Sequence, residues 1–90
     1  MYTVYVLYNF KDKNFYTGYT TNITRRINEH IRGKVTSTHK RNKILIFYEV
    51  FLDSRDARRR EKYFKTTKGK RTLRLMLKYT LVKQTLSSSG

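Results

Sequence analysis

Cysteine, proline and tryptophan are absent from this 90-residue sequence, and only six acidic residues and four glycines occur. Without cysteine, the chain has no disulfide framework, no thiolate metal site and no cysteine nucleophile. Two histidines are too few for a multi-histidine zinc site within one chain. No apolar run approaches the ~20 residues of a membrane span, and the first residues lack the pattern of a secretory signal. We therefore expect a small, soluble, cytoplasmic protein with no membrane segment.

Positive charge is the dominant feature of the composition. The chain has 21 Lys or Arg against 6 Asp or Glu, which gives a formal net charge of +15. Its 38% of hydrophobic residues is nevertheless too high for a wholly disordered chain. The charge predicts an anionic polymer as partner, with nucleic acid first and an anionic membrane surface or a ribosome-like RNA as alternatives. The length predicts one domain over residues 1–80, followed by a tail over 81–90 that is partly disordered.

Three stretches have the β-branched and aromatic composition of strands, and they cover residues 2–8, 15–20 and 44–52. The first two flank the polar segment 11–14, so we predict that they form a hairpin. The third stretch is almost continuously apolar, and we expect it to be the most buried strand.

Three helices are predicted from apolar spacing and from residues that favour helix ends. The first begins after Thr21 or Asn22, either of which can accept from an early helical N–H, and Gly33 can end it. The other two cover about residues 55–66 and 70–79. The order β-β-α-β-α-α predicts an α+β domain, with a small three-stranded antiparallel-type sheet flanked by about three helices.

Ten of the 21 basic residues lie between Arg55 and Arg74, where only Asp56 and Glu61 oppose them. Like charges four residues apart on a helix repel, so this density indicates a surface that meets phosphates. A solvated helix face is the simpler alternative. We assign nucleic-acid contacts to nine residues, which are Lys34, His39, Lys40, Arg58, Lys62, Lys65, Lys68, Lys70 and Arg71.

One carboxylate departs from the local pattern of the predicted second helix. Ala57, Glu61 and Phe64 are spaced so that they share one helical face, which a sheet should cover. A carboxylate in an apolar stripe is costly unless it is paired or binds a metal. Glu61 therefore either pairs with a neighbouring arginine or holds a divalent cation, and the spacing alone does not decide between them.

The remaining candidate residues lie on the first helix and the hairpin. Arg26 and His30 are one helical turn apart, at the edge of the stripe that begins with Ile23. A half-buried histidine with one hydrogen bond is the alternative reading of His30. Tyr5 ends the tripeptide Thr3-Val4-Tyr5, and Tyr16 opens Tyr16-Thr17-Gly18.

This ordered set resembles the GIY-YIG nuclease family. It is closest to the short stand-alone bacterial members, which are similar to the N-terminal nuclease domain of the excision-repair endonuclease. The resemblance covers about residues 2–79, although Thr3 and Thr17 replace the glycine and isoleucine of the two family tripeptides. It assigns catalytic roles to five residues, which are Tyr5, Tyr16, Arg26, His30 and the metal-binding Glu61.

The resemblance implies a metal-dependent DNA endonuclease that hydrolyses phosphodiester bonds with one divalent cation, Mg²⁺ or Mn²⁺. Arg26 would clamp the phosphate, and Tyr5 would be the general base, with His30 taking up its proton and Tyr16 helping to place water or phosphate. A single carboxylate, Glu61, suffices for one metal ion with waters and phosphate oxygens. Branched or damaged DNA is the expected substrate class, and a protein partner could supply specificity. The competing hypotheses are a non-catalytic nucleic-acid-binding module and a structural RNA-binding protein.

Overall fold

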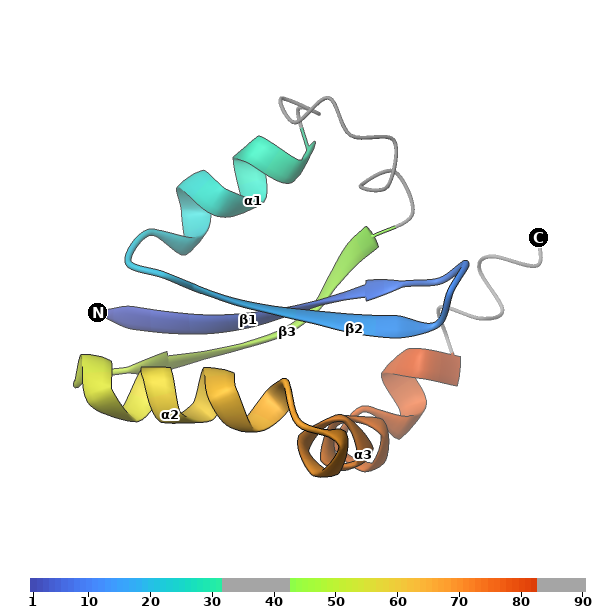
Figure 1. The fold of residues 1–90 in the computed structure, drawn as a ribbon. Coiled ribbons are helices and arrows are strands. Elements are labelled where there is room, and N and C mark those ends of the chain that lie inside the picture. Colours follow the sequence, from blue (N-terminus) through green and yellow to red (C-terminus); the bar gives the residue numbers. More distant parts are fainter. Residues whose placement is uncertain (32–42, 83–90) are drawn as a thin grey trace.

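The computed structural model describes residues 1–31 and 43–82, except the side chains of residues 30 and 31. The elements run in the order β1 (Tyr2–Asn9), β2 (Asn14–Thr20), α1 (Ile23–Ile31), β3 (Lys43–Phe51), α2 (Ser54–Phe64) and α3 (Thr67–Met76). A short helical segment follows over residues 78–82. This order confirms the predicted α+β fold (Figure 1). Across the described ranges, no helix combines the length and apolar character that crossing a membrane requires.

The sheet has the strand order β2-β1-β3, and both pairings are antiparallel. The expectation that the third strand is the most buried was wrong. β1 is buried almost throughout, whereas β3 is only half-buried, and its Tyr48 and Val50 are 53% and 47% exposed. β1 lies between two strands, while β3 is an edge strand. An apolar run reports composition, but burial depends on how many neighbours the topology provides.

The β1–β2 hairpin is closed by two side chains that bind its backbone. The Asn9 carbonyl oxygen Oδ1 accepts from the N–H of Lys11 at 2.9 Å and of Asp12 at 3.2 Å. Asp12 Oδ1 accepts from the N–H of Asn14 at 2.9 Å. Lys13 has a positive φ of 60°, and its N–H donates to the Asn9 backbone carbonyl at 2.7 Å. The loop conformation is therefore fixed by hydrogen bonds at both of its ends.

Each helix begins where a polar side chain accepts from an early N–H group. Asn22 accepts from Arg25 N at 3.0 Å, which identifies which of the two predicted caps is used on α1. Asp53 caps α2, and Thr66 caps α3 by accepting from Gly69 N. The third helix therefore begins at Thr67 rather than at residue 70, because the hydroxyl of Thr66 gives it an earlier start.

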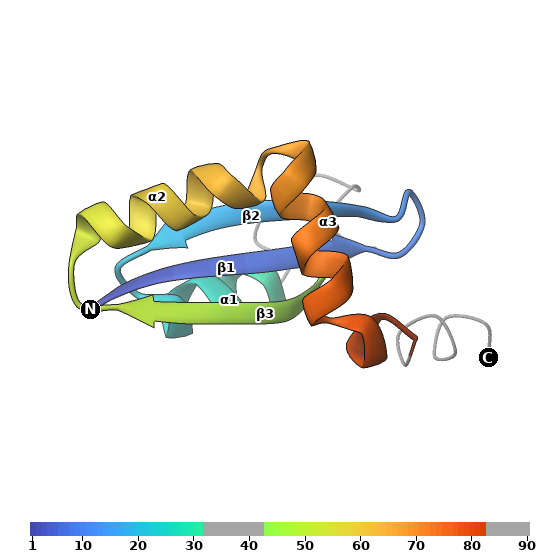
Figure 2. The same ribbon diagram turned by 90° about the horizontal axis from the view of Figure 1, so that it is seen from below.

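The helices form one layer on each side of the sheet, with α1 on one face and α2 and α3 on the other (Figure 1). Seen from the α2 side, α2 runs alongside β2, and α3 crosses the strands near the β1–β2 hairpin (Figure 2). Phe64, Leu73, Val4 and Val6 fill the space beneath α2 and α3 with no exposed area. This layer is the hydrophobic core of the domain.

Candidate active site

Tyr5 lies on the central strand and faces α1, and its side chain depends on a glycine in the neighbouring strand. It is 9% exposed and stands opposite Gly18 in the β1–β2 register. A methyl group added to Gly18 would lie 2.3 Å from both the Cζ and the hydroxyl oxygen of Tyr5. The phenol ring therefore crosses β2 at the one position without a side chain. No described residue makes a hydrogen bond to the Tyr5 hydroxyl, so this group is free to meet a substrate.

Tyr16 occupies the same face of the sheet, because it pairs with Leu7, two residues after Tyr5. Its hydroxyl donates to Asp12 Oδ2 at 2.8 Å, and Lys43 Nζ lies 3.8 Å from the centre of its ring. The hydrogen bond to the Asp12 carboxylate raises the pKa of Tyr16 above its usual value. Tyr16 is therefore held as a neutral phenol.

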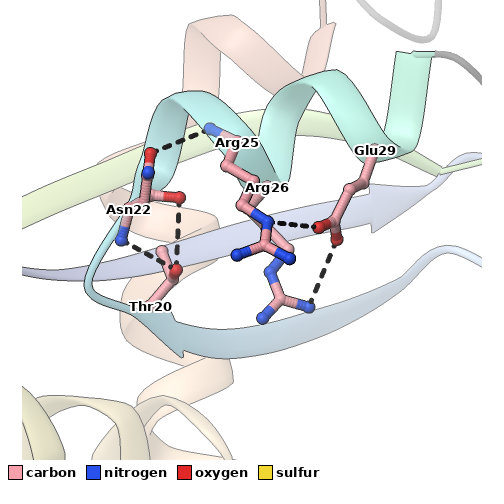
Figure 3. A network of polar contacts seen from close by, with 5 residues as sticks. All are labelled: Thr20, Asn22, Arg25, Arg26 and Glu29. Carbon is pink, nitrogen blue, oxygen red and sulfur yellow. Dashed lines mark hydrogen bonds and ion pairs between the residues drawn. The ribbon is translucent and has the colours of Figure 1, made fainter.

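Arg26 lies on the first turn of α1, on the side that faces β2. Arg25 Nε is 3.2 Å from Glu29 Oε1, while Arg26 NH1 is 4.0 Å from the other Glu29 oxygen (Figure 3). Arg26 lines a pocket of about 250 Å³ together with Tyr5, and also a polar hollow of about 240 Å³ with Thr20 and Glu29. Its guanidinium is 43% exposed, so an incoming anion can reach it.

Glu61 lies at the rim of the core, as its helical spacing predicted. Ala57 and Phe64 on the same face are fully buried, while the Glu61 side chain is 15% exposed. Its Oε1 is 3.8 Å from Arg58 NH1, and its Oε2 is 3.2 Å from Lys65 Nζ. Pairing with neighbouring cations thus accounts for this carboxylate.

The same carboxylate also fits a singly anchored cation. Arg58 and Lys65 have 63% and 56% of their side chains exposed, so they can leave the carboxylate at little cost. Among the described residues, no group of three or more acidic, histidine or cysteine side chains comes together. A cation at Glu61 would therefore take most of its ligands from water and phosphate, which suits Mg²⁺ or Mn²⁺.

Tyr5 and Glu61 lie on opposite faces of the sheet, and the edge strand β2 connects their surroundings. The Arg58 guanidinium, which pairs with Glu61, lies 3.9 Å from the ring centre of Tyr19 on β2. Tyr19 follows Gly18, the residue that the Tyr5 ring crosses. The two groups therefore approach one another around the free edge of β2. The opposite flank of α2 faces β3, where Arg60 Nε binds Glu49 Oε1 at 2.8 Å.

Several predicted residues are only partly placed. His30 belongs to α1, but its side chain lies outside the described part, as do Lys34, His39 and Lys40 entirely. The remaining predicted nucleic-acid contacts lie along α2 and α3 with side chains that are exposed or, for Lys70, half-buried. They are Arg58, Lys62, Lys65, Lys68, Lys70 and Arg71.

Sequence reasoning missed two residues that contact Tyr16. Asp12 was interpreted only as a turn residue, although its position in a short loop four residues before Tyr16 is a usable local signal. Lys43 gives no such signal. It comes from β3 and stands opposite Asn9, so its contact with Tyr16 depends on the pairing of all three strands.

Comparison with known proteins supports one family. The family model described as the GIY-YIG catalytic domain matches residues 1–74. The chain is 37% identical to a UPF0213 protein of Staphylococcus haemolyticus over 68 residues, which cover 73% of this chain and 83% of that protein. It is 34% identical over 80 residues to a UPF0213 protein of Pediococcus acidilactici, covering 84% and 82% of the two chains. No solved structure matches significantly. From these matches, the chain belongs to the GIY-YIG family of catalytic domains.

Proposed function

We propose that this protein is a DNA endonuclease that hydrolyses phosphodiester bonds at the β2 edge, using one divalent cation. The observation that carries the proposal is the phenol of Tyr5, which lies across Gly18 with no hydrogen bond from a described residue and shares a pocket with Arg26. The pocket thus combines a proton acceptor with a cation that can bind a phosphate, the two functions that this hydrolysis requires.

Tyr5 is the proposed general base. Phosphodiester hydrolysis needs a water molecule that loses its proton as it attacks phosphorus. Arg26 and Lys43 line the same pocket as Tyr5, and their positive charges favour the phenolate over the phenol through Coulombic attraction. In this scheme Tyr5 takes the proton of the attacking water, and His30, one turn after Arg26 on α1, receives it.

Arg26 is the proposed phosphate clamp. Its distance of 4.0 Å from the Glu29 carboxylate is long for a charge-assisted hydrogen bond, so this pair holds it only weakly. A phosphate offers two oxygens to the planar guanidinium and can replace Glu29 as its partner. Arg26 would then fix the phosphate beside Tyr5 and stabilise the charge that develops on its oxygens.

Glu61 is the proposed metal ligand, and Mg²⁺ and Mn²⁺ are the candidate ions. The ion, when bound, neutralises charge on the phosphate and on the leaving oxygen. For Glu61 to bind it, Arg58 and Lys65 must release the carboxylate. Both can then turn toward the DNA backbone, because both lie on the exposed side of α2.

The exposed cations of α2 and α3 are the proposed contacts to the rest of the DNA. They carry no base-specific geometry, so they favour binding to the backbone and make it sensitive to salt. Substrate choice would then come from DNA shape, such as a branch or a damaged site, or from a partner protein.

A matched pair of carboxylate variants tests the nuclease function. Glu61→Gln and Glu49→Gln remove the same charge from the two flanks of α2, but Glu49 pairs with Arg60 away from β2. Both variants and the wild type would meet supercoiled, linear and branched DNA with Mg²⁺, with Mn²⁺ and with a chelator. We expect metal-dependent cutting by the wild type and by Glu49→Gln, and none by Glu61→Gln although it still binds DNA. Cutting by Glu61→Gln at the wild-type rate would contradict the metal role.

The ion pairs of Glu61 favour a second candidate, a non-catalytic nucleic-acid-binding module. Arg58 and Lys65 satisfy the carboxylate without any metal. In such a module the tyrosines would pack the sheet or stack on bases. It predicts salt-sensitive binding that is indifferent to metal and unchanged in Glu61→Gln, with no cutting by the wild type on any of the three DNA forms.

A further inference from the structure

We propose that Asp12, in the β1–β2 hairpin loop, is a positioning residue that holds the Tyr16 proton away from the substrate, so that Tyr16 orients the attacking water while Tyr5 removes its proton. The inference rests on the proposed nuclease function and adds to it a division of labour between the two tyrosines. It also adds a residue outside the five that the family resemblance assigns.

Asp12 is built to present one oxygen in a fixed place. Its Oδ1 accepts from the Asn14 N–H at 2.9 Å, and its Oδ2 accepts from the Tyr16 hydroxyl at 2.8 Å. Its own N–H donates to Asn9 Oδ1 at 3.2 Å. The carboxylate is thus held by the closed hairpin loop, and it fixes the Tyr16 hydroxyl in turn.

A second contact fixes the ring of Tyr16. Lys43 Nζ lies 3.8 Å from the ring centre, reaching over from β3. Asp12 and Lys43 are the two charged groups that contact Tyr16 within the described residues. Of these, the Asp12 hydrogen bond is the largest influence on protonation, and it raises the pKa of Tyr16. A phenol with a raised pKa is a poor general base at neutral pH.

The Tyr16 hydroxyl is thereby left with one function. A neutral hydroxyl has one proton to donate and lone pairs that accept. The Tyr16 proton is committed to Asp12, so its oxygen can only accept, and a water molecule is the partner that offers a proton. Tyr5 shares this face of the sheet, and no described residue binds its hydroxyl. The structure therefore separates a tyrosine that can lose its proton from one that cannot.

Asp12→Asn tests this role with little change in shape. Asparagine keeps one oxygen to accept from the Asn14 N–H, but its amide group cannot accept from the Tyr16 hydroxyl as well. Asp53→Asn is the matched control. Asp53 also caps a backbone N–H with one oxygen and binds a side chain with the other, and it lies at the start of α2.

Two measurements on the full chain decide the outcome. In a titration followed by NMR of the tyrosine Cζ carbons, with Tyr16 assigned through Tyr16→Phe, Tyr16 should ionise at lower pH in Asp12→Asn than in the wild type. Single-turnover cleavage should slow by roughly 10- to 100-fold, as expected for a misplaced water, while DNA affinity stays the same. Asp53→Asn should change neither quantity.

A double variant shows whether Asp12 acts through Tyr16. Asp12→Asn in the Tyr16→Phe background should slow cleavage no further, because the hydroxyl it positions is already gone. A further loss there, or wild-type cleavage by Asp12→Asn, would overturn the positioning role. An unchanged Tyr16 titration would overturn the hydrogen bond itself. If the wild type cuts no DNA, the nuclease function fails and this role falls with it, whereas the titration still reports on the Asp12–Tyr16 pair.

Discussion

The two faces of the sheet are built differently. Beneath α2 and α3, Val4, Val6, Phe64 and Leu73 have no exposed area. Toward α1, a pocket of about 250 Å³ lies between the helix and the sheet, and Tyr5 and Arg26 line it. A chain this small buries one dense core at most, and here it does so on one face only. The other face is left open enough to hold a substrate.

Truncating one side chain on each face should give the largest contrast in stability. Phe64→Ala should lower the free energy of unfolding by about 3–5 kcal/mol, because it empties part of the dense core. Ile27→Ala should cost less than about 2 kcal/mol, because Ile27 is half-buried and already borders the pocket. Denaturant unfolding of both variants measures the difference. Equal losses would mean that α1 packs as tightly as α2.

The two glycines that touch other residues should separate stability from activity. A methyl group on Gly69 would lie 1.8 Å from the backbone carbonyl oxygen of Tyr63, so α3 would have to move away from α2. Gly69→Ala should therefore cost about 1–3 kcal/mol of stability. In Gly18→Ala the methyl group would meet only the far end of the Tyr5 side chain. That variant should unfold almost as the wild type does but lose cleavage, because the Tyr5 phenol must turn away.

Unfolding curves and cleavage rates for both glycine variants check this prediction. A stable Gly69→Ala protein would show that the two helices are not in close contact. A Gly18→Ala protein with full activity would show that the Tyr5 ring does not need to cross β2.

Removing the acid beside Arg26 should strengthen DNA binding by a few-fold. Glu29→Gln frees Arg25 and Arg26 to meet phosphate, and the pairs it breaks are exposed enough to be worth under about 1 kcal/mol of stability. Glu49→Gln is the control on the other face, where it should weaken stability more than it changes DNA affinity. Fluorescence anisotropy at several salt concentrations measures both. Weaker binding by Glu29→Gln would place the DNA elsewhere.

The smallest effect concerns acid stability at the start of α2. Hydrogen bonds from the Arg55 side chain and N–H hold the pKa of Asp53 below its usual value of 3.8. A lowered folded-state pKa stabilises the fold above the unfolded value, and this contribution is lost as the pH falls through the folded value. The melting temperature of Asp53→Asn should therefore lie slightly below that of the wild type at pH 5 and converge with it below about pH 3.8. A constant difference down to pH 2 would contradict this assignment.

The same contrast explains what the sequence could predict. The strands, the cap at Asn22 and the shared face of Ala57, Glu61 and Phe64 depend on residues that are close in sequence, and the structure confirms them. The edge position of β3 and the contact between Lys43 and Tyr16 depend on which strands pair and in which register. No local pattern encodes that choice. The catalytic roles of the five family positions remain predictions.

The central claim is that residues from the two faces act on one phosphate around the edge of β2. The most direct test compares single-turnover cleavage by Arg26→Ala, by Glu61→Gln and by the double variant, at high protein concentration with Mn²⁺. Groups that act as a unit show strongly non-additive losses. We therefore expect the double variant to be no slower than the slower single variant. A double variant whose loss equals the product of the two single losses would show that the two residues act independently, and would contradict a shared site.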